Sequence, residues 1–224
     1  MRRVMLCLCL VVMCLSASAV LGVRPSASRP HDDAAELKEP PLELSVEIEG
    51  KRFDARLGQP VDVEIGGKKT SLTVKAGPSR TLRVAGVEFR YPSTGTFSVE
   101  ASDPKMTLWT IRDGSDSVFL MRYADKIEPQ AALKQTLEGM SGQYDQRNVK
   151  RSPTTIKLAN QQLKGVRLTI SIGAQRIDQS FYAMDTGRST VVLILQEPGP
   201  LPGEAAYKAG PLPGMMQQTF RIVK

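Results

Sequence analysis

Only four side chains in the 224-residue chain carry a thiol or an imidazole, the groups that most often act as nucleophiles, general bases or zinc ligands: Cys7, Cys9, Cys14 and His31. The three cysteines lie inside the apolar run Met5–Leu15, and the histidine lies in a proline-rich stretch, 20–41, that is typical of a disordered leader. We therefore expect neither residue type in the folded part. This excludes Ser-His-Asp and Cys-His triads and a Cys/His zinc site from that part.

The first 19 residues have the layout of a secretory signal peptide. Arg2 and Arg3 precede an apolar run that is too short to span a bilayer, and Ser16–Ala19 supplies the small residues of a cleavage site. The short run disfavours an uncleaved anchor, and the bulky Met13 before Cys14 disfavours a lipoprotein. A twin-arginine signal is disfavoured because the apolar run begins too close to the start. We expect cleavage after about Ala19, export to the periplasm or the outside, and no transmembrane span afterwards.

The carboxylates are the remaining candidates for catalysis or metal binding. A carboxylate-based hydrolase is the third hypothesis for this chain, with the candidate residues Glu100, Asp103, Asp113, Asp116, Asp178 and Asp185. The segment Asp113-Gly114-Ser115-Asp116 could hold Ca²⁺, but it lacks the distant Glu of an EF-type loop, and a hairpin turn is the simpler interpretation. We predict no catalytic residue, no metal and no cofactor.

Two other sets of residues are candidates for binding. Six basic residues within 147–167 could meet anionic lipid headgroups, an acidic cell-wall polymer or an acidic protein, or could simply be solvated: Arg147, Lys150, Arg151, Lys157, Lys164 and Arg167. Nucleic acid is disfavoured because few aromatic residues are interleaved with them. Four aromatic residues could line a ligand groove or fill the core: Trp109, Phe119, Phe181 and Tyr182.

The elements that would position these residues begin after the leader. Apolar and polar residues alternate in short segments at Leu44–Ile48, Phe53–Leu57 and Val61–Ile65, with turns at Glu49-Gly50-Lys51 and Gly66-Gly67. We expect a β-hairpin-rich extension over 42–78. Such a small unit without cysteines should pack on its neighbour or on a partner.

The main domain is expected over 79–224. Strands are predicted at Thr81–Ala85, Val87–Tyr91, Thr96–Glu100, Met106–Arg112, Ser117–Ala124, Val166–Ile172, Ile177–Met184 and Val191–Leu195. Helices are predicted from Pro129 to about Gln143, over Glu204–Ala209 and over Leu212–Phe220, with a polar loop at Asp145–Pro153. The apolar Val191–Leu195 should be a central strand covered on both faces, which we expect helices to do. The predicted fold class is therefore α+β, an antiparallel sheet flanked by helices in an α-β-α sandwich.

Several short motifs occur in a recognisable order within this domain: Phe89-Arg90-Tyr91-Pro92, Phe97-Ser98-Val99, Trp109, Gly165–Gly173, Phe181-Tyr182 and Gln218-Thr219-Phe220-Arg221-Ile222. In this order, over about 87–224, the chain resembles the PsbP-like superfamily of photosystem extrinsic subunits and DcrB-like exported proteins. The resemblance implies an α-β-α sandwich with accessory, assembly or binding roles. No functional residue of the family matches a position here, and the hairpin extension departs from the single-domain members.

Together these observations predict an exported, non-catalytic binding or accessory protein of the cell envelope, with an envelope protein or an anionic surface as its partner. The alternative is a module that binds a small molecule or a lipid in a cavity between the sheet and a helix. The partner, the ligand and the oligomeric state do not follow from the sequence.

Overall fold

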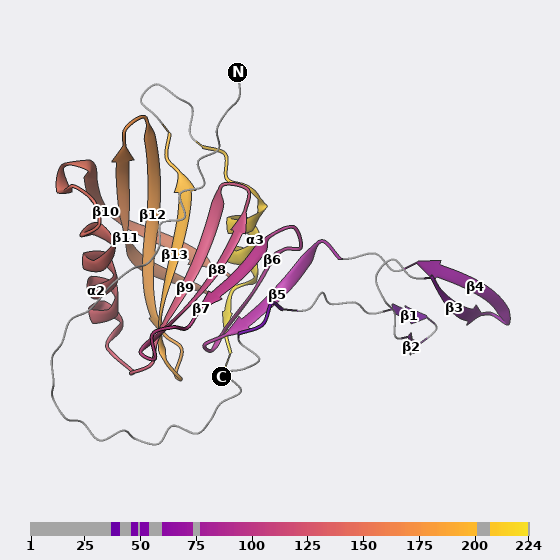
Figure 1. The fold of residues 1–224 in the computed structure, drawn as a ribbon. Helices are drawn as coiled ribbons and strands as arrows, with labels where there is room; N and C mark the ends of the chain where they lie inside the picture. Colours follow the sequence, from indigo (N-terminus) through magenta and orange to yellow (C-terminus); the bar gives the residue numbers. More distant parts are fainter. Residues whose placement is uncertain are drawn as a thin grey trace. The chain divides into compact units, whose positions relative to one another are not determined.

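A seven-stranded antiparallel sheet forms the centre of the computed structural model, which describes residues 37–40, 46–48, 50–53, 60–73, 77–200 and 207–223 (Figure 1). In spatial order its strands are β10 (Val149–Leu158), β11 (Gln161–Ile172), β12 (Gln175–Asp185), β13 (Thr190–Pro198), β9 (Asp116–Tyr123), β8 (Met106–Asp113) and β7 (Thr96–Glu100). The apolar strand β13 lies in the middle, as predicted. Its residues Thr190–Leu195 are all buried because both faces of the sheet are covered.

Helix α2 (Pro129–Ser141) covers one face, which we call the α2 face. Proline suits the first helical turn, where its missing N–H has no partner to lose. Ala132, Leu133 and Leu137 recur at helical spacing and are buried against Leu168, Ile170, Phe181, Val192 and Ile194 of the sheet. A short 3₁₀ helix, η1 (Gln146–Asn148), then leads into β10.

The opposite face, which we call the α3 face, is covered mainly by a second sheet. This sheet has the strand order β14 (Arg221–Ile222), β6 (Val87–Pro92) and β5 (Ser79–Val84), and it is joined by helix α3 (Pro211–Thr219). Phe89 of β6 and Phe220 after α3 stack with ring centroids 6.0 Å apart. Both belong to the larger hydrophobic core, which also contains Trp109 and Tyr182 of the main sheet.

The predicted fold class is therefore wrong. The protein is mostly β: 56% of the described residues lie in strands, the described part has two short α-helices, and the fold is not an α-β-α sandwich. The prediction assumed that a strand apolar on both faces needs helices on both sides. A second sheet buries such a face equally well, and here it supplies most of the cover.

Most individual elements lie close to their predicted positions, with two exceptions. The strands predicted between 81 and 124 correspond to β5 to β9, and the helices predicted from Pro129 and over Leu212–Phe220 correspond to α2 and α3. The predicted loop Asp145–Pro153 is wrong, because η1 and the first half of β10 occupy it. Of the predicted helix Glu204–Ala209, residues 207–209 are irregular, and 204–206 lie outside the described residues.

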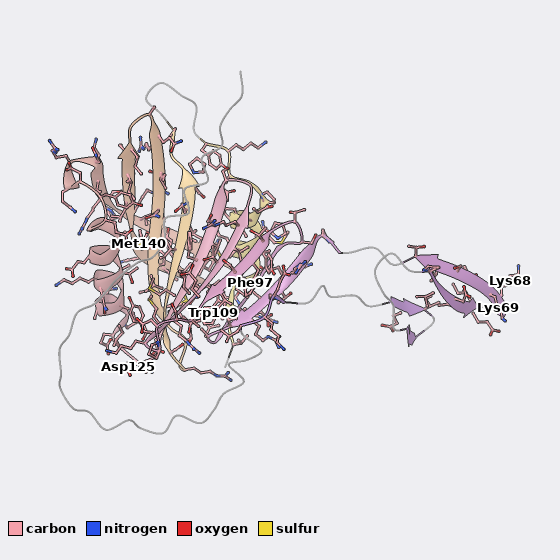
Figure 2. All side chains as sticks on the ribbon, in the orientation of Figure 1. Lys68, Lys69, Phe97, Trp109, Asp125 and Met140 are labelled. Carbon is pink, nitrogen blue, oxygen red and sulfur yellow. The ribbon has the colours of Figure 1, made fainter. Side chains whose placement is uncertain are left out.

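The hairpin-rich segment contains two short sheets. Strand β1 (Val46–Ile48) pairs with β2 (Lys51–Phe53), and β3 (Pro60–Ile65) pairs with β4 (Lys68–Thr73). The predicted Gly66-Gly67 turn is confirmed, with φ angles of 55° and 76° that favour glycine. Lys68 and Lys69 lie at the tip of this hairpin (Figure 2).

Several predictions fall on residues that the structure does not describe. The signal peptide with its three cysteines, His31 and residues 54–57 of the predicted strand Phe53–Leu57 lie outside the described residues. Within the described part, no helix is long and apolar enough to cross a bilayer.

Candidate functional site

Strand pairing gathers polar side chains on one half of the α3 face. Residues paired directly across strands project from the same side of a sheet, and Leu195 identifies this side because it belongs to the α3-face core. The row of residues paired across neighbouring strands that includes Leu195 also contains Ser152, Arg167 and Ser180. The next row toward the β11–β12 turn contains Lys150, Thr169, Asp178 and Glu197. The face thus changes from apolar to polar at Leu195.

A cavity of about 160 Å³ lies where this polar half meets α3, and we call it the Glu197 cavity. It is lined by Thr154, Thr155, Ile156, Lys157, Arg167, Ser180, Tyr182, Leu195, Glu197 and, from α3, Gln217. The backbone N–H of Ala159 donates to the Gln217 carbonyl at 2.8 Å, which fixes α3 against the end of β10. The cavity therefore has hydroxyl, amide, guanidinium and carboxylate groups on its walls.

The packing of Tyr182 against Gly165 shapes one side of the cavity. A Cβ atom on Gly165 would lie 2.1 Å from the Phe181 carbonyl oxygen and 2.5 Å from Cδ1 of Tyr182, so only glycine fits there. The Tyr182 ring lies over this glycine, and its hydroxyl is 3.5 Å from Oγ1 of Thr154. Tyr182 is buried. The missing side chain on β11 thus makes room for an aromatic ring from β12.

The charged groups of the polar half are held by short contacts. Nε of Arg167 donates to Oγ of Ser180 at 3.2 Å. Oγ1 of Thr169 donates to Asp178 at 2.7 Å, and Asp178 is paired with Arg176 at 3.6 Å. These bonds orient the side chains before any ligand is present.

Glu197 is a carboxylate of this region whose pKa is raised above its ordinary value. Burial raises its pKa, the nearby charges of Asp116 and Asp178 raise it further, and the positive charge of Arg167 lowers it by less than their combined effect. Asp116 is itself buried at the β8–β9 turn, where it accepts a hydrogen bond from the Gly210 N–H at 2.6 Å. A half-buried carboxylate with a raised pKa inside a cavity marks a candidate functional site.

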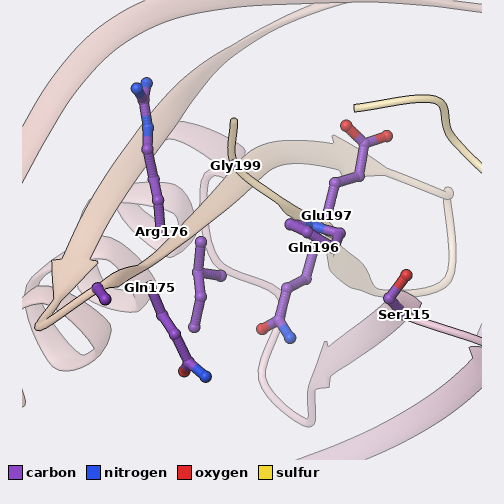
Figure 3. A pocket seen from close by; sticks show the side chains of 9 residues that line it. Ser115, Gln175, Arg176, Gln196, Glu197 and Gly199 are labelled. Atoms are coloured by element: carbon purple, nitrogen blue, oxygen red, sulfur yellow. The ribbon is translucent and has the colours of Figure 1, made fainter. Parts of the chain in front are cut away.

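A second cavity of about 360 Å³ shares Glu197 and is lined by Ser115, Ala174, Gln175, Arg176, Ile177, Gln196, Glu197, Pro198 and Gly199. Figure 3 shows that Arg176 and Glu197 project to one side of the sheet, whereas Gln175 and Gln196 project to the other. This agrees with the alternation along β12 and β13. The second cavity is therefore lined by side chains from both sides of the sheet, and these side chains do not converge on one point.

The six predicted basic residues do not form one patch. Lys150 and Arg167 project from the α3 face, whereas Arg151, Lys157 and Lys164 project from the α2 face. Arg147 lies in η1 and pairs with Asp145 at 2.7 Å. Of the six, Arg167 and Lys157 line the Glu197 cavity, although the Lys157 side chain starts from the other face.

The four predicted aromatic residues do not line one groove either. Trp109 and Tyr182 belong to the α3-face core, whereas Phe181 belongs to the α2-face core and Phe119 packs against it. Trp109 has Arg122 above its ring at 5.5 Å. Only Tyr182 lines a cavity described above. The other three fill the two cores.

The two candidate carboxylates on β12 are held apart. Asp178 and Asp185 lie seven residues apart on β12, so they project from opposite faces, and Asp185 pairs with Lys126 at 3.0 Å. Asp103 accepts a hydrogen bond from the Lys105 N–H at 2.8 Å, while Glu100 ends β7. The predicted hairpin turn at Asp113–Asp116 is confirmed, since these two residues pair across it and Gly114 has a φ of 63°.

Sequence reasoning missed Glu197, the residue shared by both cavities. It lies two residues beyond the apolar run Val191–Leu195, at which the predicted strand ends. No apolar alternation marks Gln196, Glu197 and Pro198 in the sequence, although β13 continues through them. Its neighbours Arg167 and Asp178 are predicted candidates, Arg167 in the basic set and Asp178 among the carboxylates.

Comparisons with known proteins do not assign the site. No protein family model matches the chain, and no curated protein matches it at a significant level. The resemblance to the PsbP-like superfamily therefore stays a prediction. Within the described residues, no group of three or more His, Cys, Asp or Glu side chains is placed to hold a metal ion.

Proposed function

We propose that the chain is an exported, non-catalytic binding protein that holds a small polar ligand in the Glu197 cavity. One observation carries this proposal: a guanidinium, Arg167, and a carboxylate, Glu197, line the same small space between the sheet and α3. This corresponds to the small-molecule alternative derived from the sequence. The polar walls favour a hydrogen-bonding ligand over a lipid.

The charges on the walls define the ligand class. Arg167 can bind a carboxylate through two parallel N–H groups, and Glu197 can accept hydrogen bonds from an ammonium or a hydroxyl group. Thr154, Ser180 and Gln217 add neutral hydrogen-bonding groups around them. With a volume of about 160 Å³, the cavity suits a free amino acid or a small sugar acid.

The test is a thermal-shift and calorimetric screen of the full protein against free amino acids and sugar acids. At least one class should stabilise the wild type, and Arg167→Gln should abolish the effect. Lys164→Gln is the matched control, because Lys164 is an exposed cation on the same strand but projects from the other face. Absence of binding to every member of the panel, or equal binding by Arg167→Gln, would contradict the proposal.

Export is the second part of this proposal, and it rests on the signal-peptide layout of the first 19 residues. An envelope protein or an anionic surface is the partner expected in that compartment. Mass spectrometry of the protein recovered from the expressing cells should find a mature chain that begins at about Val20. A chain that retains Met1 in the cytoplasmic fraction would contradict export.

A further inference from the structure

The outer surface of the second sheet carries a group of arginines that the proposed ligand cavity does not use. They surround a cleft of about 550 Å³ lined by Thr81, Arg83, Glu88, Phe89, Arg90, Thr219 and Arg221. The cleft is built across all three strands: Glu88 of β6 pairs with Arg83 of β5 on one side and with Arg221 of β14 on the other. Two guanidinium groups thus meet one carboxylate, and a third arginine, Arg90, lines the same cleft.

Glu88 holds two of these arginines in place from below. Nε of Arg83 donates to its Oε2 at 2.6 Å, and Nε of Arg221 donates to its Oε1 at 2.6 Å. The second terminal nitrogen of each arginine also pairs with the same carboxylate. The Glu88 side chain is only 7% exposed, whereas those of Arg83 and Arg221 are 69% and 60% exposed. The carboxylate therefore lies under the guanidiniums.

Arg90 is the third guanidinium, and a neutral group fixes it. Its Nε donates to Oγ of Ser79 at 3.0 Å, and its second terminal nitrogen bonds to the same oxygen. The backbone N–H of Arg90 donates to Oγ1 of Thr219 at 2.8 Å, which ties β6 to the end of α3. Arg90 therefore brings a positive charge to the cleft without a matching carboxylate among these contacts.

The charge and the donor geometry of the cleft point to an anion. One carboxylate cannot neutralise three guanidiniums, so the lining residues carry an excess of two positive charges. A guanidinium has five N–H donors, and the contacts to Glu88 use only part of them. The rigid fork of an arginine fits the paired oxygens of phosphate and sulfate, and fixing it in advance lowers the entropic cost of binding.

We propose that this cleft is a binding site for a tetrahedral oxyanion, a phosphate or sulfate group, held by Arg83, Arg90 and Arg221. The group is carried either by a small molecule or by an anionic lipid. Glu88 is a positioning residue that holds two of the arginines and does not contact the ligand.

The test titrates the full protein with inorganic phosphate and with sulfate at constant ionic strength, followed by calorimetry and by NMR shifts. Saturable binding should weaken at least tenfold in Arg83→Gln and in Arg90→Gln. Lys164→Gln should bind like the wild type, since Lys164 lies on the main sheet. Arg90→Gln leaves both ion pairs of Glu88 in place, so it stays informative if Arg83→Gln or Arg221→Gln unfolds.

A second arm separates the two carriers of the oxyanion. Co-sedimentation uses phosphatidylcholine vesicles with and without phosphatidylglycerol. Binding of free phosphate alone assigns a soluble ligand, and arginine-dependent binding of the phosphatidylglycerol vesicles assigns a lipid headgroup. The proposal is overturned if neither probe binds, or if Arg83→Gln and Arg90→Gln bind both probes as the wild type does. Arg167→Gln should not alter either result, so this site and the Glu197 cavity can fail independently.

Discussion

The carboxylate of Glu197 lies half-buried among groups that oppose its ionisation. Because burial and the charges of Asp116 and Asp178 raise its pKa, the folded protein holds this proton more tightly than the unfolded chain does. The resulting stabilisation is fully present below the ordinary pKa of a glutamate, near 4.5. It is lost as the pH rises through the raised pKa of the folded state.

We therefore expect Glu197→Gln to be more stable than the wild type at pH 7.5, because the glutamine places no charge in this half-buried position. At pH 4 the two proteins should unfold at the same temperature, because the wild-type carboxylate is then protonated. Thermal unfolding followed by circular dichroism over this pH range measures the difference. Glu100→Gln, at the end of β7, is the control, and its unfolding temperature should match the wild type at both pH values. A destabilised Glu197→Gln at pH 7.5 would show that the carboxylate is well paired.

The contact between Gly165 and Tyr182 gives a second prediction at this scale. Gly165→Ala should destabilise the protein by about 3 kcal/mol, because the new methyl group would overlap the Phe181 carbonyl and the Tyr182 ring. Urea unfolding measures this loss. Gly139→Ala is the matched control, since Gly139 lies in α2 with nothing near its Cβ position. Alanine there should stabilise the helix by up to about 1 kcal/mol.

At the scale of elements, strand β10 shows how an exposed edge is protected. It is the last strand of the seven-stranded sheet, so one side of its backbone is unpaired within that sheet. Lys150, Arg151 and Lys157 are exposed along it, and Pro153 lacks a backbone N–H. Charges and proline on an edge strand prevent pairing with other molecules. Part of the basic set noticed in the sequence thus has a structural role.

Replacing Lys150, Pro153 and Lys157 together by threonine should therefore promote self-association. Size-exclusion chromatography with light scattering should show dimers or larger species at concentrations where the wild type is unchanged. Lys134→Thr, at an exposed position of α2, should leave the elution unaltered. If the triple variant eluted like the wild type, protection of the edge would have to come from the strand's shape.

The sequence analysis predicts no strand at β10, because the charges and the proline that protect this edge also hide it. Sequence patterns detect a strand by its apolar alternation, and an edge strand with charges and a proline shows little of it. Strands β11 and β13 were found because their apolar residues face the cores. Strands β5 and β6 of the second sheet are predicted from the sequence. Their packing on the α3 face of the main sheet is not.

At the scale of the whole molecule, the carboxyl-terminal segment closes the larger core. Phe220 is 1% exposed and stacks on Phe89, more than 100 residues earlier in the chain. The backbone N–H of Val223 donates to the Gly86 carbonyl at 2.9 Å, next to the pairing of β14 with β6. The α3-face core is thus complete only when the last residues have docked.

Phe220→Ala should accordingly destabilise the protein by about 3 to 5 kcal/mol, because it leaves a cavity in this core. Chemical denaturation measures the change. Phe97→Ala on the edge strand β7 is the comparison, since Phe97 is only partly buried and its loss should cost clearly less. Equal costs would show that Phe97 and Phe220 contribute alike to the core.

The sequence alone determined the local features of this protein. Apolar alternation, the proline at the start of α2 and the glycine turns depend on neighbouring residues, so the strands, the helices and the Asp113–Asp116 turn could be predicted. Only the tertiary structure decided the fold class and the sites. Glu197 meets Arg167 through the register of three strands, and Arg83 meets Arg221 through strands at opposite ends of the domain. Such pairings bring together residues far apart in the chain, and no local pattern records them.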